Sequence, residues 1–103
     1  MPFHLIGEEV PEWMERELMD FSGMKDLVMY RDRSLVGFSM DGGLEESVQR
    51  ILIAMADKGW IPVASGIDGI YSMAKKEGDV RWMIMQCVEE RDCTSVVLHI
   101  GRD

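Results

Sequence analysis

The side chains best suited to covalent or acid–base chemistry are two cysteines, Cys87 and Cys93, and one histidine in a predicted strand, His99. A catalytic nucleophile needs a base within hydrogen-bond reach, and that base needs a third group to orient it. The strand registers derived below place only Ile84 opposite His99, and they hold the two thiols too far apart for a disulfide. We therefore expect no catalytic residue, a structural role for His99 and two free cysteines.

Three further patterns could hold a ligand, and each has a simpler explanation. Met83 and Met85 lie on one strand face about 7 Å apart, as in a copper site, but methionine is a common filler of irregular cores. The stretch Asp41-Gly42-Gly43 precedes a helix, yet it lacks the lysine and glycine spacing of a phosphate loop. The acidic residues in 8–20 lack the ligand pattern of a calcium loop. We expect neither a metal nor a cofactor.

The composition is that of one globular domain covering residues 1–103. Hydrophobic residues make up 47% of the chain and charged residues 29%, and the net charge is −8. A negative field repels phosphate backbones and anionic lipids. We therefore expect no nucleic-acid partner and no membrane partner. An aromatic sheet face could stack RNA bases, but the flanking basic residues of such modules are missing.

The chain carries no recognisable targeting segment. Its start, "MPFHLIGEEVPEW", has neither a basic n-region nor a long apolar stretch. No window is long and apolar enough for a membrane-spanning helix. Together these features predict a cytoplasmic protein.

Two segments have helical periodicity. In residues 11–21, Pro11 suits a first helical turn, and Met14, Leu18 and Phe21 fall on one stripe. In "LEESVQRILIAMADK", residues 44–58, apolar side chains recur at i, i+3 and i+4. Asp41 and the glycines before this second helix offer an N-terminal cap, and the Gly-Trp pair after it predicts a Schellman ending.

The remaining segments predict strands. Residues 34–40 alternate as a strand does, with a weaker strand signal at 27–30. Four more apolar runs follow the second helix, separated by "DG", "KEGD" and "ERDC". The order is α-β-α-β-β-β-β. We predict an α+β fold, in which one antiparallel meander sheet of about five strands packs on the central helix beside a short N-terminal helix.

The turns assign side chains to two faces of the sheet. Two-residue loops at Asp68-Gly69 and Glu77-Gly78, and a four-residue loop at 90–93, set the registers. The first face, expected to pack on the central helix, contains Ile61, Val63, Ile70, Met83, Met85, Cys87, Val96, Leu98 and Ile100. The second face contains Ala64, Tyr71, Met73, Trp82, Ile84, Gln86, Val97 and His99.

The second face is too apolar to remain in water unless it has a partner. Three covers are possible: the N-terminal helix with Trp13, Leu18 and Phe21, a second copy of the chain, or a small ligand. The binding or interface candidates are Tyr71, Met73, Trp82, Ile84, Gln86, Val97, His99 and Trp13.

Two functions are consistent with these features. The first is a small cytoplasmic, non-enzymatic interaction or regulatory protein, a homo-oligomer or a binder of another protein through the second face. The second is a small-molecule binding protein or an unrecognised enzyme, with a pocket between the N-terminal helix and Tyr71, Trp82, Gln86 and His99. If the N-terminal helix covers the second face, the acidic surface is the remaining working surface.

Overall fold

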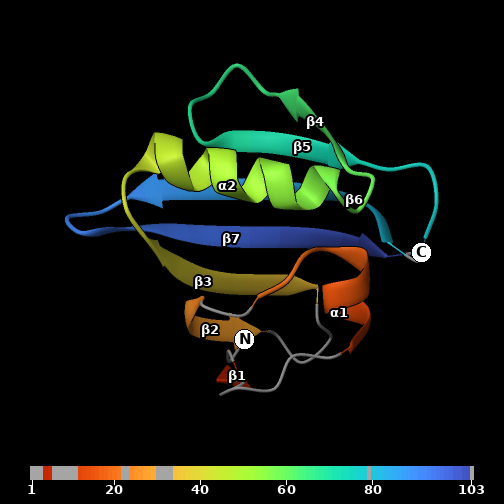
Figure 1. Ribbon diagram of the computed structural model, residues 1–103, viewed down its shortest axis with the longest axis horizontal. Coiled ribbons are helices and arrows are strands. Elements are labelled where there is room, and N and C mark those ends of the chain that lie inside the picture. The colour runs from red at the N-terminus through yellow and green to blue at the C-terminus, as the bar shows by residue number, and fades with distance from the viewer. Residues whose placement is uncertain (1–3, 6–11, 22–23, 30–33, 79, 103) are drawn as a thin grey trace.

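One antiparallel sheet carries both helices on the same side (Figure 1). The computed structural model describes residues 4–5, 12–21, 24–29, 34–78 and 80–102. In chain order the elements are β1 (His4–Leu5), α1 (Glu12–Glu17), β2 (Lys25–Met29), β3 (Leu35–Asp41), α2 (Leu44–Ala56), β4 (Ile61–Ala64), β5 (Ile70–Ala74), β6 (Val80–Glu89) and β7 (Cys93–Arg102). The strands run in the spatial order β1-β2-β3-β7-β6-β5-β4.

The predicted α+β class is confirmed, and so is the meander that follows α2. The sheet is wider than the five strands expected, because β2 and the two-residue β1 extend it beyond β3. Strand β2 is irregular: its register shifts between Lys25 and Val28, and Asp26 has a φ of 54°. This bulge explains why the strand signal there was weak, since an extra residue breaks the alternation of side chains.

Helix α2 lies across the sheet and buries Val48, Ile51 and Met55. Its end has the predicted Schellman geometry: Trp60 N donates to Met55 O at 3.1 Å and Gly59, at a φ of 94°, donates to Ala56 O at 3.0 Å. Trp60 then folds back into the core, where it is 2% exposed.

The start of α2 matches the expectation in part, since one of the glycines is the N-cap and Asp41 is not. Gly43 is the N-cap and makes no side-chain hydrogen bond, while Asp41 pairs with Lys25 instead. A carboxylate from the far end of β6 takes the capping role, because Glu89 Oε2 accepts a hydrogen bond from Leu44 N at 3.2 Å. A Cβ on Gly43 would lie 3.0 Å from the same oxygen, so a larger N-cap residue would shift the Glu89 carboxylate.

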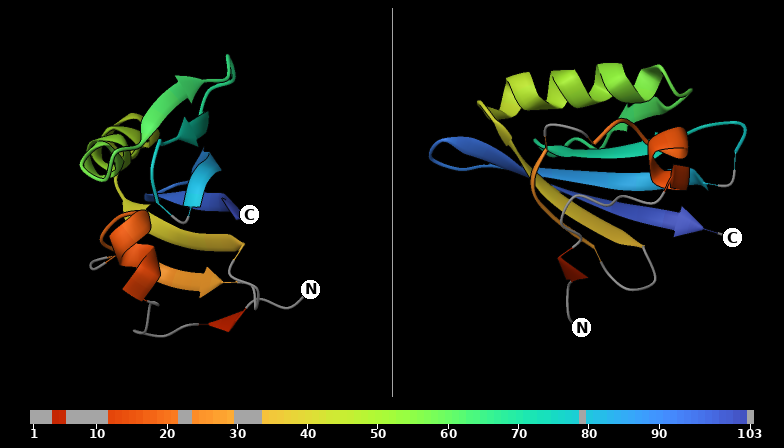
Figure 2. Two further views of the ribbon diagram at one scale, coloured as in Figure 1. Left: turned by 90° about the vertical axis from the view of Figure 1, so that its right-hand side faces the viewer. Right: turned by 60° about the horizontal axis from the view of Figure 1, so that its bottom comes forward.

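Helix α1 is shorter than the predicted 11–21, and it lies on the same side of the sheet as α2 (Figure 2, left). The chain after it stays buried, with Leu18, Met19 and Phe21 in the core. The possibility that the N-terminal helix covers the second face is therefore wrong. Trp13 is half-buried against the core on the helix side, so it does not border that face either.

A cluster of Glu17, Lys75 and Trp60 joins α1 to the sheet. Lys75 Nζ lies 2.9 Å from Glu17 Oε1 and donates to Glu17 O at 2.8 Å. The same carbonyl accepts a hydrogen bond of 2.7 Å from Trp60 Nε1, and the Lys75 ammonium lies 4.9 Å from the centre of the Trp60 ring. These contacts connect segments 58 and 43 residues apart in the chain. They explain why α1 packs where it does.

The β6–β7 register is the predicted one, with Glu89 opposite Thr94 and Ile84 opposite His99. The β5–β6 register is not. The predicted loop pairs Lys76 with Asp79, which lies outside the described residues, whereas the structure pairs Ala74 with Trp82 and Lys75 N donates to Arg81 O. The difference is one residue, and one residue exchanges the two faces of a strand.

Strands β4 and β5 are therefore turned over relative to the prediction. Tyr71 and Met73 face the helices, and Met73 is 1% exposed. Ile61, Val63 and Ile70 lie on the opposite side, and Ala64 pairs with Tyr71. On the helix side Met73 is buried and Tyr71 packs against the core, and Lys75, the next residue in the same alternation, contacts Glu17 there.

The Asp68-Gly69 turn is present, with Ile70 N donating to Ile67 O at 3.1 Å. It does not pair Ile67 with Ile70 in the ladder, because the β4–β5 pairing begins at Ala64 and Tyr71. Gly69 instead lies against β6: its φ is 82°, and a Cβ there would lie 2.5 Å from Cys87 O. Only glycine fits both the backbone conformation and the contact.

Candidate functional site

The side of the sheet away from the helices is the first candidate site. We call it the open face, and it is built from alternate residues of five neighbouring strands, β3, β7, β6, β5 and β4. Its larger side chains are Leu35, Ile61, Val63, Ile70, Trp82, Ile84, Gln86, Val88, Val97 and His99. Figure 2 (left) shows no described helix on this side.

The open face is apolar and exposed. Trp82 is 51% exposed, Ile61 55%, Val63 57% and Val88 60%. On β6, the residues that alternate with the open face, Met83, Met85 and Cys87, are buried on the other side of the sheet. Several large apolar side chains gathered on one face are unusual for a protein surface without a partner and are typical of an interaction site.

Two glycines allow side chains of neighbouring strands to lie close to the backbone of the sheet. A Cβ on Gly101 would collide with the indole of Trp82 on the neighbouring strand, so that ring lies across the glycine. A Cβ on Gly37 would lie 3.3 Å from a methyl group of Val28. The Trp82 ring therefore lies over the backbone of the neighbouring strand instead of standing upright.

A single hydrogen-bonded pair lies among these carbons. His99 Nε2 is 2.7 Å from Gln86 Oε1, so the imidazole N–H donates to the amide oxygen across β6 and β7. The side chain directly opposite His99 is Ile84, as predicted. The hydrogen-bond partner of this imidazole is therefore an amide, which cannot serve as a nucleophile.

Charged side chains lie at the border of the open face. None of its ten larger residues is ionisable apart from His99. At the end of β3, Lys25 Nζ and Asp41 Oδ1 form an ion pair of 2.9 Å, and Asp41 raises the pKa of the Lys25 ammonium. Near the β6–β7 turn, Ser95 Oγ donates to Glu90 Oε2. The middle of the face is uncharged in a chain of net charge −8.

Five of the predicted candidates meet on the open face: Trp82, Ile84, Gln86, Val97 and His99. Tyr71, Met73 and Trp13 do not belong to it. The sequence reasoning missed Leu35, Val88 and the three β4–β5 residues. Leu35 and Val88 could have been found by continuing the alternation of β3 and β6 to their ends.

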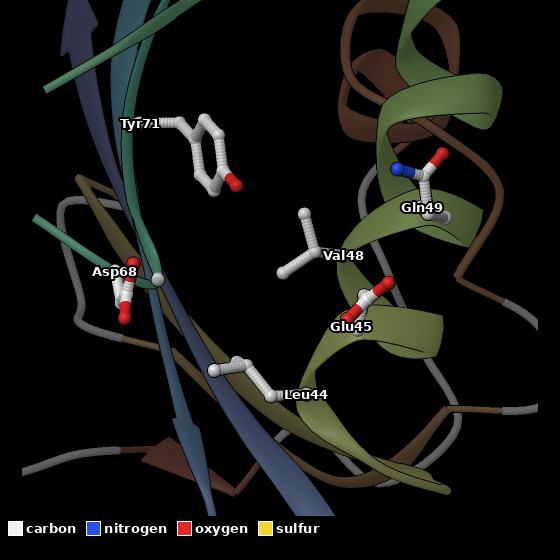
Figure 3. Close-up of a pocket in the computed structure, with 7 residues that line it drawn as sticks. Leu44, Glu45, Val48, Gln49, Asp68 and Tyr71 are labelled. Atoms are coloured by element: carbon white, nitrogen blue, oxygen red, sulfur yellow. The ribbon is translucent and has the colours of Figure 1, made fainter. Parts of the chain in front are cut away.

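The second candidate site is a pocket of about 280 Å³ between α2 and the turn before β5 (Figure 3). It is lined by Leu44, Glu45, Val48, Gln49, Asp68, Gly69 and Tyr71. The expected pocket of Tyr71, Trp82, Gln86 and His99 under the N-terminal helix does not form, because α1 lies on the other side of the sheet. Of those four side chains, Tyr71 alone lines the pocket found here.

The described part of the chain lacks two other kinds of feature. No three His, Cys, Asp or Glu side chains there lie close enough together to hold a metal ion. None of the helices there has the length and apolarity needed to cross a membrane.

Comparison with protein-family models, with curated proteins and with solved structures finds no match to this chain.

Proposed function

We propose that this is a small cytoplasmic, non-enzymatic interaction or regulatory protein that forms a homodimer through its open face. The observation that carries the proposal is the one-sided fold: both helices pack on one face of the sheet, and the other face presents exposed apolar side chains. Burial of apolar surface is the main favourable term in protein association.

Charge favours a second copy of the chain as the occupant. Each copy carries a net charge of −8, so contacts between most parts of two copies bring like charges together. The open face is the apolar region whose middle holds no charged side chain. Two copies that meet there keep their acidic surfaces apart, and the ion pair of Lys25 and Asp41 stays at the border.

The size of the face suits a two-fold symmetric interface. Five strands about 4.8 Å apart, with about six residues each at about 3.3 Å, make a face roughly 24 Å by 20 Å. Its projected area, roughly 480 Å² before the relief of the side chains is counted, is of the order that each partner contributes to a stable interface, about 800 Å² of accessible surface. Two such sheets would stack about 10 Å apart.

Face-to-face packing is favoured over edge-to-edge pairing. At one edge of the sheet, β4 is four residues long and contains Pro62, which has no N–H to donate to another strand. At the other edge, β1 has two residues. Short edge strands and prolines discourage strand addition.

The thiols support the proposed compartment. Cys87 and Cys93 are both free, which is the usual state in the reducing cytoplasm. The non-enzymatic character rests on His99, whose hydrogen-bond partner is an amide in an apolar surrounding and not a nucleophile or an acid.

The direct test is Ile84→Glu, in the middle of the open face. In the dimer this carboxylate would be buried without a partner, at a cost of several kcal/mol. We expect the dimer to dissociate at least about 100-fold more readily, as measured by sedimentation velocity over a concentration series.

The matched control is Ile53→Glu, which makes the same change on α2. Ile53 is 69% exposed on the opposite side of the molecule, so its variant should remain a dimer. Circular dichroism on both variants checks that the fold persists. If Ile84→Glu stays as dimeric as Ile53→Glu, the open face is not the interface and the proposal fails.

A further inference from the structure

The pocket between α2 and β5 has a mixed lining that no part of the dimer proposal uses. Figure 3 shows the Tyr71 ring, from β5, and the Val48 side chain, from α2, directed toward one another across it. Leu44 closes the apolar floor at the start of the helix. Glu45 and Gln49 on the helix, and Asp68 on the turn, supply the polar atoms.

The polar groups of the lining are available to a ligand. Among the described residues, neither Tyr71 nor Gln49 has a hydrogen-bond partner, and the Glu45 and Asp68 carboxylates make no ion pair. The lining contains two carboxylates and no lysine or arginine. An apolar floor with a few unpartnered polar groups around it is the usual construction of a small-molecule site.

Local structure holds both walls in place. Ser65 Oγ accepts a hydrogen bond from Ile67 N at 3.1 Å and donates to Ile70 O at 2.8 Å, so the turn that carries Asp68 is cross-linked to itself. The Gly69 carbonyl is held by β6, since Cys87 N donates to Gly69 O at 2.8 Å. The walls of the pocket are therefore preorganised for a ligand.

We propose that this pocket binds a small organic cation, a protonated amine on an aromatic or aliphatic body. The body would lie on Leu44, Val48 and the Tyr71 ring, and the ammonium would lie between the carboxylates of Glu45 and Asp68.

The same features reject an anion. The N–H groups at the start of α2 would attract one, but Glu89 already accepts from Leu44 N, and Glu45 and Glu46 lie in the first turn. With the net charge of −8, an anionic ligand would meet repulsion on approach as well as in the pocket.

The experiment compares three probes of similar size: benzylammonium, neutral benzyl alcohol and benzoate. Each is titrated into the unmodified protein at physiological salt, and the backbone amide shifts are followed by NMR. We expect saturable shifts with benzylammonium, centred on Leu44, Val48, Gly69 and Tyr71. Benzyl alcohol should bind about ninefold more weakly, the combined effect of losing two half-exposed ion pairs, and benzoate should not bind.

Two variants in the same helical turn distinguish binding in the pocket from a general effect of the protein's net charge. Glu45→Gln should weaken benzylammonium binding about threefold, because it removes one wall carboxylate. Glu46→Gln changes the net charge equally but does not line the pocket, so its affinity should stay that of the unmodified protein. Asp68→Asn should behave as Glu45→Gln does.

Three results overturn the proposal. Equal binding of benzyl alcohol and benzylammonium would mean an apolar groove without selection for charge. Shifts scattered over the acidic surface would mean diffuse ion attraction. Equal weakening by Glu45→Gln and Glu46→Gln would show that the Glu45 carboxylate has no particular role. None of these results depends on whether the protein dimerises.

Discussion

At the scale of single residues, the sheet gives its two cysteines different surroundings. Cys87 faces the helices and is buried, whereas Cys93 begins β7 on the other side and is half-buried. Burial raises the pKa of the Cys87 thiol to about 11, because the interior disfavours the thiolate. The thiolate is the reactive form, so reactivity should differ between the two sites.

We predict that iodoacetamide alkylates Cys93 and leaves Cys87 unmodified in the folded protein at pH 8. Peptide mass spectrometry after a short exposure measures this, and the same exposure in denaturant should modify both residues. Alkylation of Cys87 at a rate equal to that of Cys93 in the folded protein would contradict the packing described for β6.

The same pKa has a consequence for stability at high pH. Above pH 9 the unfolded chain loses the Cys87 proton while the folded chain keeps it up to about pH 11. The unfolded state then binds fewer protons, so this residue makes the fold less stable as pH rises through that window.

At the scale of elements, the accuracy of the sequence reasoning depended on where the determining contacts lie. The ending of α2 and the β6–β7 register are set by residues close in the chain, and both were predicted. The β5–β6 register and the side taken by α1 go together with the contacts of Lys75 with Glu17, which are 58 residues apart. Periodicity shows that α1 has an apolar stripe, but it does not show which face of a sheet receives it.

The contacts of Glu17 lead to a prediction about stability. Burial raises the pKa of the Glu17 carboxyl, but the hydrogen bond and charge of Lys75, the Val80 N–H and Arg16 together outweigh it, and the net pKa is lowered. We expect Glu17→Gln to lower the free energy of unfolding by about 3 kcal/mol at pH 7, the lower end of the cost for a buried pair that loses one partner.

The pH dependence of the free energy of unfolding shows whether the charge of Glu17 is responsible for this loss. A lowered folded pKa stabilises the fold above the unfolded value of 4.5, and that stabilisation disappears as pH falls through the folded pKa. Urea unfolding should therefore show the gap between Glu17→Gln and the unmodified protein narrowing below pH 4.5. Glu15→Gln, an exposed change on the same helix, should stay within about 0.5 kcal/mol at either pH. A gap that is unchanged by acid would mean that Glu17 acts through packing and not through charge.

At the scale of the whole molecule, the fold separates two kinds of surface. The helix side carries the core, the α1 contacts and the pocket beside α2, and the open face carries exposed apolar side chains with charges at its border. The sequence predicted that an apolar second face exists and named five of its side chains. It assigned β4 and β5 to the wrong sides, because one turn residue decides the orientation of both strands.

Ionic strength should act on this assembly in a defined direction. An apolar interface between two copies of charge −8 works against long-range repulsion, and salt screens that repulsion. We therefore expect added salt to strengthen the association. An interface built from ion pairs would respond in the opposite direction.

The most direct test is the mass of the unmodified protein in solution, measured by light scattering on a sizing column at low micromolar concentration and at two salt concentrations. The proposed dimer requires a particle of twice the 11.8 kDa chain mass that persists or becomes more stable at the higher salt. A particle of 11.8 kDa under both conditions would contradict it, because the open face would then remain in water without a second copy.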